Sequence, residues 1–324
     1  MVRVGVDESL SPELLTGFPP EAEIVRIPRD NSTEEFAVDF WILPFARKDA
    51  ANIFSRLRGV KVVQSMMAGV DWITPWLPKD VTLCDGRGIH DISTSEWVLA
   101  TILSEMKRFP LYRDLQRKHE WAGQASVRDD FMREPGAHAG LYRILSEDLS
   151  GKTVLIVGYG SIGAAIEWRL APFGVHILRV ARTPRNTPQV SAVSDLHWLL
   201  PEADIVVVIV PFTPETHKLF GAHELGLMKR GALLINAARG PVVDTDALIE
   251  TLVAHKIRAA LDVTDPEPLP PDHPLWSAPN CFITPHIAGS TPEFIHRAFR
   301  FGAAQVGRYV AGEPLENIVT EAGY

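Results

Sequence analysis

The stretch TVLIVGYGSIG, residues 153–163, is the part of the sequence that decides the fold class. An apolar run at its start is followed at once by Gly158, Gly160 and Gly163, in the spacing G-x-G-x-x-G, and then by helical composition over 164–171. Such a glycine pattern is weak evidence alone, but here it stands between a strand and a helix, as dinucleotide binding requires. The stretch therefore predicts a strand–turn–helix unit that binds a dinucleotide.

Each glycine of this motif has a physical task. Gly158 and Gly160 permit a tight turn and a close approach of the backbone to a pyrophosphate, and Gly163 lets the helix pack on the strand. The start of the helix adds free N–H groups and the positive end of the helix dipole. The residues predicted to contact the cofactor here are Gly158, Tyr159, Gly160, Ser161, Ile162 and Gly163.

Short apolar runs alternate with helical stretches on both sides of this motif. The alternation is typical of an α/β protein with parallel sheets. The run IVVVIV, residues 205–210, is apolar throughout and predicts a strand buried on both faces. The expected strands form an early set, 2–6, 23–27, 40–43 and 60–63, and a later set, 153–157, 175–180, 205–210, 232–236, 258–262 and 282–284.

Two helical stretches indicate how the chain divides. One long helix is expected over about 94–118, with Ser93 and Glu96 in capping-box spacing at its start. A second, over 292–310, follows the last strand and can return the chain to the first domain. We therefore expect two doubly wound domains, one made of 1–95 and 290–324 and the other of 96–289, with a ligand between them.

Length and composition narrow the class of protein. The chain has 324 residues, enough for about two domains, and 46% hydrophobic with 22% charged residues excludes a disordered or collagen-like chain. A net charge of −8 without a long basic run disfavours nucleic acid and anionic membranes as partners. The longest apolar run, 205–210, is far below a membrane span of ~18–20 residues.

The two cysteines, Cys84 and Cys281, cannot build a zinc cluster or a disulfide framework. They favour a reducing compartment, so we expect a cytoplasmic protein. The N-terminal MVRVGVDESL has a strand-like pattern and predicts no signal peptide. No HExxH or similar metal-ligand spacing appears, so no metal is expected.

Three segments of the second half carry polar side chains just after expected strands. LLINAARGPVVD, 233–244, contains Arg239; AALDVTDPEPLPPDHPLW, 259–276, contains Asp262 and Glu267; FITPHIAGST, 282–291, contains His286. Open parallel sheets bind ligands at the carboxyl ends of their strands. These side chains are therefore predicted to meet at one edge of the sheet.

Together the segments resemble the D-isomer-specific 2-hydroxyacid dehydrogenase family, in particular its glyoxylate/hydroxypyruvate reductase-like members. SMMAGVD (65–71), the glycine motif, VPFTPETHKLF (210–220), NAARG, DVTDPEP and TPHIAG occur in the family's order and spacing. The resemblance implies a discontinuous flavodoxin-like substrate domain and a Rossmann dinucleotide-binding domain. It also implies hydride transfer between NAD(P)H and a small 2-keto acid or D-2-hydroxy acid, and a homodimer that forms through the long helix at 94–118.

The residue types suit that reaction. Arg239 offers a planar, charged fork for the carboxylate and the keto oxygen of the substrate. His286 can donate or accept the proton, because imidazole titrates near neutral pH. Glu267 fixes the imidazole tautomer and stabilises its charged form if it contacts the far ring nitrogen; Asp265 is a neighbouring competitor for that place.

Other contacts follow from the resemblance. The substrate carboxylate is expected against the backbone N–H groups of a nest-like loop, made of Met67, Ala68, Gly69 and Val70. Asp262 is expected near the nicotinamide carboxamide, with a purely structural loop role as the alternative. Further cofactor contacts are expected at Pro211, Thr216, Ala237, Ala238, Ala288 and Gly289.

The choice of nicotinamide cofactor is predicted from the end of the second Rossmann strand. An acid there would bind the ribose hydroxyls of NAD, but the sequence has Ala181, Arg182 and Thr183, with Arg185 close by. Arg182 can pair with a 2′-phosphate and Thr183 can donate a hydrogen bond to it. We therefore expect NADP(H) to be favoured over NAD(H), unless Arg182 only caps the strand or stacks on adenine.

Some alternatives stay open. A regulatory protein of the same fold could use the dinucleotide as a signal, although it would not need Arg239, Glu267 and His286 together. A relative acting on formate or phosphite would keep the fold and change the substrate. The polar segment 121–145 is either a dimer-contacting arm or a surface excursion.

Overall fold

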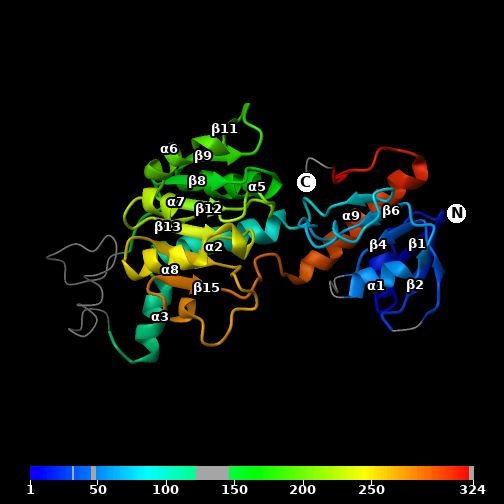
Figure 1. Ribbon diagram of the computed structural model, residues 1–324, viewed down its shortest axis with the longest axis horizontal. Helices are drawn as coiled ribbons and strands as arrows, with labels where there is room; N and C mark the ends of the chain where they lie inside the picture. The colour runs from blue at the N-terminus through cyan, green and yellow to red at the C-terminus, as the bar shows by residue number, and fades with distance from the viewer. Residues whose placement is uncertain (31–32, 45–48, 122–145, 321–324) are drawn as a thin grey trace. The chain divides into compact units, whose positions relative to one another are not determined.

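The computed structural model describes residues 1–30, 33–44, 49–121 and 146–320 (Figure 1). The chain forms two compact units: the first is Met1–Asp91 with Ser290–Tyr324, and the second is Ile92–Gly289. Each unit is built on a parallel sheet with helices, so the predicted α/β class is confirmed. The division after Asp91 lies four residues before the boundary expected from the sequence. Residues 122–145 of the polar segment lie outside the described part of the chain.

The first unit has a five-stranded parallel sheet in the order β2-β1-β4-β6-β7. Numbered within this sheet, the order is 2-1-3-4-5, the flavodoxin-like order. Helix α9, Pro292–Ala311, covers it with Ala298, Phe299 and Val306, which pack in one cluster with β1 and β4. The other elements are β1 Val2–Asp7, β2 Ala22–Ile27, β3 Phe36–Ala37, β4 Phe40–Ile42, β5 Leu57–Arg58, β6 Val62–Gln64, β7 Thr82–Cys84, α1 Ala50–Ser55 and the 3₁₀ turn η1 Pro12–Leu15.

The second unit has an eight-stranded sheet in the order β10-β11-β9-β8-β12-β13-β14-β15. From β11 to β15 every pairing is parallel and the strands follow the Rossmann order. Its elements are α2 Asp91–Met106, α3 Phe109–Arg117, β8 Thr153–Val157, α5 Ser161–Leu170, β9 His176–Ala181, β10 Arg185–Asn186, β11 Gln189–Ala192, α6 Leu196–Leu199, β12 Ile205–Val208, α7 Ala222–Leu227, β13 Leu233–Asn236, α8 Thr245–Val253, β14 Arg258–Leu261 and β15 Cys281–Ile283, with 3₁₀ turns η3 Ala171–Phe173, η4 Val193–Asp195, η5 Leu200–Glu202, η6 Gly240–Val242 and η7 Pro274–Ser277.

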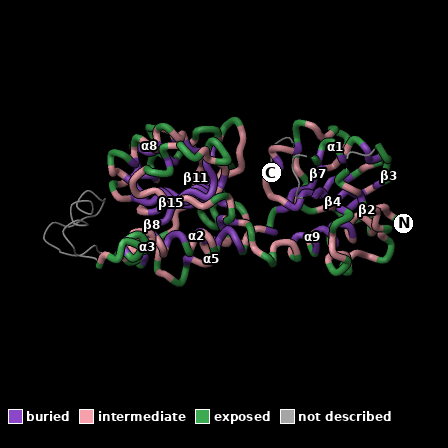
Figure 2. The backbone as a smooth tube through the Cα atoms, turned by 90° about the horizontal axis from the view of Figure 1, so that it is seen from below, coloured by how far each residue is buried: buried purple, intermediate pink, exposed green. Residues whose placement is uncertain are grey.

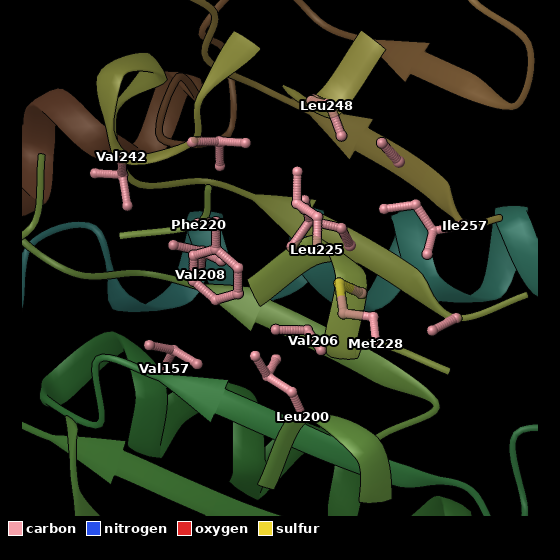
Figure 3. Close-up of a cluster of buried hydrophobic side chains, with 14 of the residues drawn as sticks. Val157, Leu200, Val206, Val208, Phe220, Leu225, Met228, Val242, Leu248 and Ile257 are labelled. Carbon is pink, nitrogen blue, oxygen red and sulfur yellow. The ribbon is translucent and has the colours of Figure 1, made fainter. Parts of the chain in front are cut away.

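All four residues of β12 are buried, as predicted, but the strand ends at Val208, two residues before the expected end at 210. Buried residues gather in the interior of this unit (Figure 2). Val206 and Val208 point into a cluster with Phe220, Leu225 and helix α8 (Figure 3). The alternate residues of β12, Ile205 and Val207, pack on the opposite face of the sheet against α2 and α5. Helices on both faces therefore hold the sheet edge in place. Among the described residues, no helix is both long and apolar enough to cross a membrane.

The single helix expected over 94–118 is two helices. Helix α2 ends at Met106 and α3 begins at Phe109, because Arg108 has a left-handed backbone (φ 59°) and Pro110 stands in the first turn of α3. Proline has no N–H to continue a helix, so it is tolerated only near a helix start. The predicted capping box is also wrong: α2 already begins at Asp91, which places Ser93 and Glu96 inside the helix.

Most of the apolar side chains of this region pack within the second unit. Ile102, Met106 and Leu115 are buried, and the first two pack against the Rossmann strands. Helix α2 thus supplies core. Two other apolar residues of the region are less covered: Phe109 is exposed, at 60%, and Trp97 is half-buried.

Candidate active site

The glycine turn between β8 and α5 has the geometry that the motif predicts. Gly158 has φ 106°, and a Cβ there would lie 2.5 Å from the carbonyl oxygen of Ile209, so only glycine fits. A Cβ on Gly163 would lie 3.0 Å from the carbonyl oxygen of Gly158, which shows how closely α5 begins against the turn. At Gly160 a Cβ would meet nothing within 4 Å. The turn therefore leaves open space in front of the helix N-terminus, which suits a pyrophosphate.

Arginine side chains surround the next residue, Tyr159. The guanidinium of Arg185 lies 5.2 Å from the ring centroid, and its Nη2 donates to the Tyr159 carbonyl oxygen at 3.0 Å. Arg179 lies 5.5 Å from the same ring and is paired with Glu167. Arg185, four residues after the end of β9 at Ala181, is therefore anchored to the backbone of the glycine turn.

The end of strand β9 is basic. Ala181 ends β9, and Arg182 and Thr183 follow it as exposed residues. The pKa of Glu215, on the loop after β12, is lowered chiefly by a hydrogen bond from the Thr213 side chain and, more weakly, by the charge of Arg182. On the same loop, the hydroxyl of Thr216 donates to the Pro211 carbonyl oxygen at 2.8 Å.

The turn that carries Arg239 is held by Asn236, the last residue of β13, which is buried. The Asn236 Oδ1 accepts from the Ala238 N–H at 3.0 Å, and its Nδ2 donates to the Arg239 carbonyl oxygen at 3.1 Å. Ala237 also donates its N–H to the Val208 carbonyl oxygen at 3.1 Å. The backbone of all three residues after the strand is thus fixed, and Arg239 itself is half-buried.

His286 and Glu267 are in direct contact. The Nδ1 of His286 lies 2.7 Å from Glu267 Oε1, with exposed side-chain fractions of 33% and 41%. This resolves the choice between the two acids of the loop, because Glu267 is the carboxylate at the imidazole. The contact engages Nδ1 and leaves Nε2 as the ring nitrogen that can meet a substrate.

The Arg239 turn and the Glu267 loop are packed against each other at Gly240. A Cβ at Gly240 would overlap the carbonyl oxygen of Thr264, so the close approach requires glycine. The Thr245 hydroxyl also donates to the Asp265 carbonyl oxygen at 2.9 Å. These contacts tie the chain after Arg239 to the loop that brings Glu267 to the imidazole.

Asp262 is almost fully buried, at 2% exposure, and its carboxylate accepts from the segment that holds His286. Oδ1 accepts from the Thr284 hydroxyl at 2.6 Å and the Ile287 N–H at 2.8 Å, and Oδ2 accepts from the Ala288 N–H at 2.9 Å. The neighbouring Gly289 carbonyl oxygen accepts from Ser93 Oγ at 3.3 Å. Three of the roughly four acceptor positions of a carboxylate are thus occupied by protein.

In the first unit, the loop expected to hold a carboxylate is shaped by Ser65 and Gly86. The Met67 N–H donates to Ser65 Oγ at 3.0 Å, so this N–H is already used. Gly86 donates its N–H to the Met67 carbonyl oxygen at 2.9 Å. Among the described residues, the backbone N–H groups of Ala68, Gly69 and Val70 have no recorded hydrogen bond. These three N–H groups are therefore available as donors.

The structure thus brings Arg239, Glu267, His286 and Asp262 together at the strand ends of one sheet, while residues 67–70 belong to the other unit. Sequence reasoning missed Asn236 and Thr284. A signal for Asn236 exists, because a polar residue that ends a buried strand needs a partner for each of its polar atoms. Its partners could not be named without the turn.

Comparisons with known proteins agree with this geometry. The family that matches is described as D-isomer specific 2-hydroxyacid dehydrogenase, NAD binding domain, over residues 99–288. A glyoxylate reductase of Thermofilum pendens is 32% identical, with 91% of this chain and 83% of that protein covered. A glyoxylate/hydroxypyruvate reductase B of Klebsiella pneumoniae is 39% identical, with 80% and 78% covered.

Among solved structures, the NADPH-dependent glyoxylate/hydroxypyruvate reductase of Sinorhizobium meliloti, in complex with NADP and sulfate, has a TM-score of 0.80 and 28% sequence identity. The match covers 100% of this chain and 99% of that one. The open glycine turn, the parallel sheets and these matches lead to one conclusion. The chain belongs to the D-isomer specific 2-hydroxyacid dehydrogenase family and is an NAD(P)-dependent oxidoreductase.

Proposed function

We propose that this protein reduces a small 2-keto acid to the D-2-hydroxy acid, with glyoxylate and hydroxypyruvate as the first candidates. The observation that carries the proposal is the 2.7 Å contact between His286 Nδ1 and Glu267 Oε1. His286 follows β15, and Asp262 follows β14, the strand that pairs with β15. A contact of this kind orients an imidazole for proton transfer. The names of the most similar relatives support the substrate class.

His286 acts as the general acid in this proposal. Its Nε2 gives a proton to the carbonyl oxygen of the substrate as the hydroxyl forms, while Glu267 holds Nδ1 and stabilises the imidazolium. In the oxidising direction the neutral imidazole accepts the proton from the hydroxyl. Glu267 has the same orienting task in both directions.

Arg239 binds the substrate. Its Nη1 donates to the Ala238 carbonyl oxygen at 2.9 Å, which fixes one arm of the guanidinium. A guanidinium has five N–H donors, enough to meet a carboxylate and a keto oxygen as well. The N–H groups of Ala68, Gly69 and Val70 in the first unit are proposed as donors to a substrate carboxylate. We accordingly assign 1–95 with 290–324 to the substrate and 96–289 to the dinucleotide.

The open turn at Gly160 fits a dinucleotide. Residues 158–163 would hold its pyrophosphate, and Pro211, Thr216, Ala237, Ala238, Asp262, Ala288 and Gly289 would line its nicotinamide half. When bound, the nicotinamide supplies the hydride for the keto carbon. The chain itself binds, orients and protonates the substrate.

NADP(H) is proposed as the favoured cofactor. Support comes from the basic strand end, where Arg182 and Thr183 stand in place of an acid and Arg185 is anchored on Tyr159. The solved relative with NADP bound supports the same choice. A charge-assisted hydrogen bond to the 2′-phosphate contributes about 1.5–3 kcal/mol.

The test is a turnover assay with glyoxylate, hydroxypyruvate and phenylpyruvate, each with NADPH and with NADH. We expect oxidation of NADPH that depends on the keto acid. The products from hydroxypyruvate and phenylpyruvate should have the D configuration, whereas glycolate, formed from glyoxylate, is achiral. Binding of NADPH without turnover of any 2-keto acid would overturn the proposal and favour a dinucleotide-sensing regulator. Turnover only with formate or phosphite would keep the fold assignment and change the substrate.

A homodimer in the cytoplasm is proposed as the working state. The support that remains for a contact near α3 is the exposure of Phe109 and of Trp121 just beyond it. The contact would be two-fold and isologous. Light scattering at micromolar protein should return twice the chain mass, and a monomer there would contradict the assembly. Support for the compartment comes from the two cysteines, Cys84 and Cys281, which are both free thiols.

A further inference from the structure

Asp262 is a buried carboxylate that has no cation beside it. At 2% exposure it has no salt bridge within 4.0 Å among the described residues. A buried carboxylate is costly unless it is paired with a cation or fully hydrogen-bonded. The oxygen atoms of Asp262 are compensated by hydrogen bonds from the 284–288 segment.

Three successive backbone N–H groups are directed at this one residue. The His286 N–H donates to the Asp262 carbonyl oxygen at 2.7 Å, and the next two, of Ile287 and Ala288, donate to its carboxylate at 2.8 and 2.9 Å. The Thr284 hydroxyl adds a fourth hydrogen bond at 2.6 Å. The segment on both sides of the imidazole is therefore fastened to a single side chain and its own carbonyl group.

The backbone of His286 needs such fastening. Its φ is 55°, in the left-handed region that residues with a Cβ rarely adopt. Released from its acceptors, the segment would relax toward an ordinary conformation and turn the imidazole away from Glu267. The strained conformation persists only where the surroundings determine it.

We infer that Asp262 is a positioning residue for the reaction: its carboxylate holds the 284–288 segment in the conformation that keeps His286 on Glu267. The inference rests on the proposed role of His286 as the proton donor. It gives Asp262 a task that needs no contact with the nicotinamide. Three of the acceptor positions of its carboxylate are occupied by donors of the 284–288 segment, and this holds with or without a cofactor contact at the fourth.

The test is a double-mutant cycle with Asp262→Asn and His286→Ala. Asp262→Asn keeps the shape but turns an NH₂ group toward an N–H donor, so it should displace the segment. A misplacement of about 1 Å costs roughly 10²-fold in rate, so we expect kcat to fall 10- to 100-fold. The KM for the keto acid should stay within about twofold, and any change in the Kd for NADPH, which reports the separate nicotinamide contact proposed for Asp262, should be smaller than the fall in kcat. In the His286→Ala background the same substitution should change kcat less than about twofold, because effects of residues that act as a unit are not additive.

Thr284→Val is the milder matched variant. It removes one hydrogen bond and leaves the carboxylate and both N–H donors in place, so kcat should fall about 3- to 10-fold with His286 present and stay unchanged without it. This variant carries the test if Asp262→Asn does not fold.

Two results would overturn the inference and differ from each other. If the Asp262→Asn effect persists in the His286→Ala background, or appears mainly in the Kd for NADPH, Asp262 acts on the cofactor and not through His286. If His286→Ala alone retains wild-type kcat, the proposed function of His286 fails, and the inference fails with it.

Discussion

The two units differ in the side chains that follow their parallel strands. In the second unit, β13, β14 and β15 are followed by Arg239, Glu267 and His286, which are ionisable and partly exposed. In the first unit, the ends of β6 and β7 are followed by Ser65 and Asp85, which are buried. Burial raises the pKa of the Asp85 carboxyl more than its contacts with Arg87 lower it.

The difference lies in what each strand end offers a ligand. The polar side chains of the first unit are turned to their own backbone: Gln64 Nε2 donates to the carbonyl oxygens of Ser65 and Asp85 at 2.8 and 3.0 Å. What they leave for a ligand is backbone N–H. The second unit offers a guanidinium, a carboxylate and an imidazole ring. Substitutions in the second unit should therefore affect chemistry, and those in the first should affect substrate affinity and stability.

The largest effect is expected at His286. His286→Ala removes the proton donor and should lower kcat for keto-acid reduction by roughly 10²–10⁴, the usual size of general acid catalysis. The Kd for NADPH should change little, since the proposed partner of the imidazole is the substrate and not the cofactor. Steady-state kinetics and a direct NADPH titration measure both quantities. A variant with near wild-type kcat would show that the second unit holds its proton donor elsewhere.

Arg239→Lys tests whether substrate binding by the second unit depends on the planar shape of the guanidinium as well as on its charge. Lysine keeps the charge but loses the planar fork, so the variant should still be badly impaired. Loss of a buried charge-assisted contact is worth about 2–5 kcal/mol, or roughly 30- to 4,000-fold in kcat/KM. Circular dichroism should show an unchanged fold. An effect below about threefold would mean that the first unit alone holds the carboxylate.

The sequence predicts most of the sheet framework, because buried strands and a glycine turn are determined locally. The strand Thr153–Val157 and the need for glycine at 158 follow from residue type and spacing. The Glu267–His286 pair was anticipated only through the resemblance to a family. Its contact depends on two loops that are 19 residues apart in the chain.

What the sequence did not predict depends on tertiary contacts. Helix α2 presents its apolar face to the Rossmann sheet, and nothing in its own periodicity tells a core from a dimer contact. The Met67 N–H is used by Ser65 Oγ, which requires the bend of the loop. The task of Asn236 likewise appears only once the turn after β13 is known.

A smaller effect is expected at the cofactor end of the second unit. Arg182→Ala should erode a preference for NADPH over NADH of roughly 10- to 150-fold in kcat/KM, because a charged hydrogen bond to the 2′-phosphate contributes about 1.5–3 kcal/mol. NADH turnover should be nearly unchanged, and it serves as the internal control. Wild-type enzyme that prefers NADH, or a variant that keeps the full NADPH preference, would contradict the assignment of Arg182.

The smallest effect tests the first unit through Gly86. A Cβ there would lie 2.7 Å from the Met66 carbonyl carbon and 2.9 Å from the Met67 nitrogen, both backbone atoms, so one of the two loops must shift. Overpacking of this kind costs about 1–3 kcal/mol of unfolding free energy. If the N–H groups of 68–70 bind the carboxylate, the shift of their loop in Gly86→Ala should raise the KM for the keto acid about 3- to 10-fold. This corresponds to a loss of about 0.7–1.4 kcal/mol of binding free energy, because each 1.4 kcal/mol is tenfold.

Gly307→Ala, in helix α9 of the same unit, is the matched control for this last prediction. A Cβ at Gly307 meets nothing within 4 Å, so the exchange should stabilise the helix by about 0.5–1 kcal/mol and leave KM unchanged. The pH dependence of kcat should be the same in both variants, because neither touches an ionisable group of the second unit. A Gly86→Ala variant that lowered kcat while KM stayed constant would place the first unit in the chemical step and end the contrast between the two sheets.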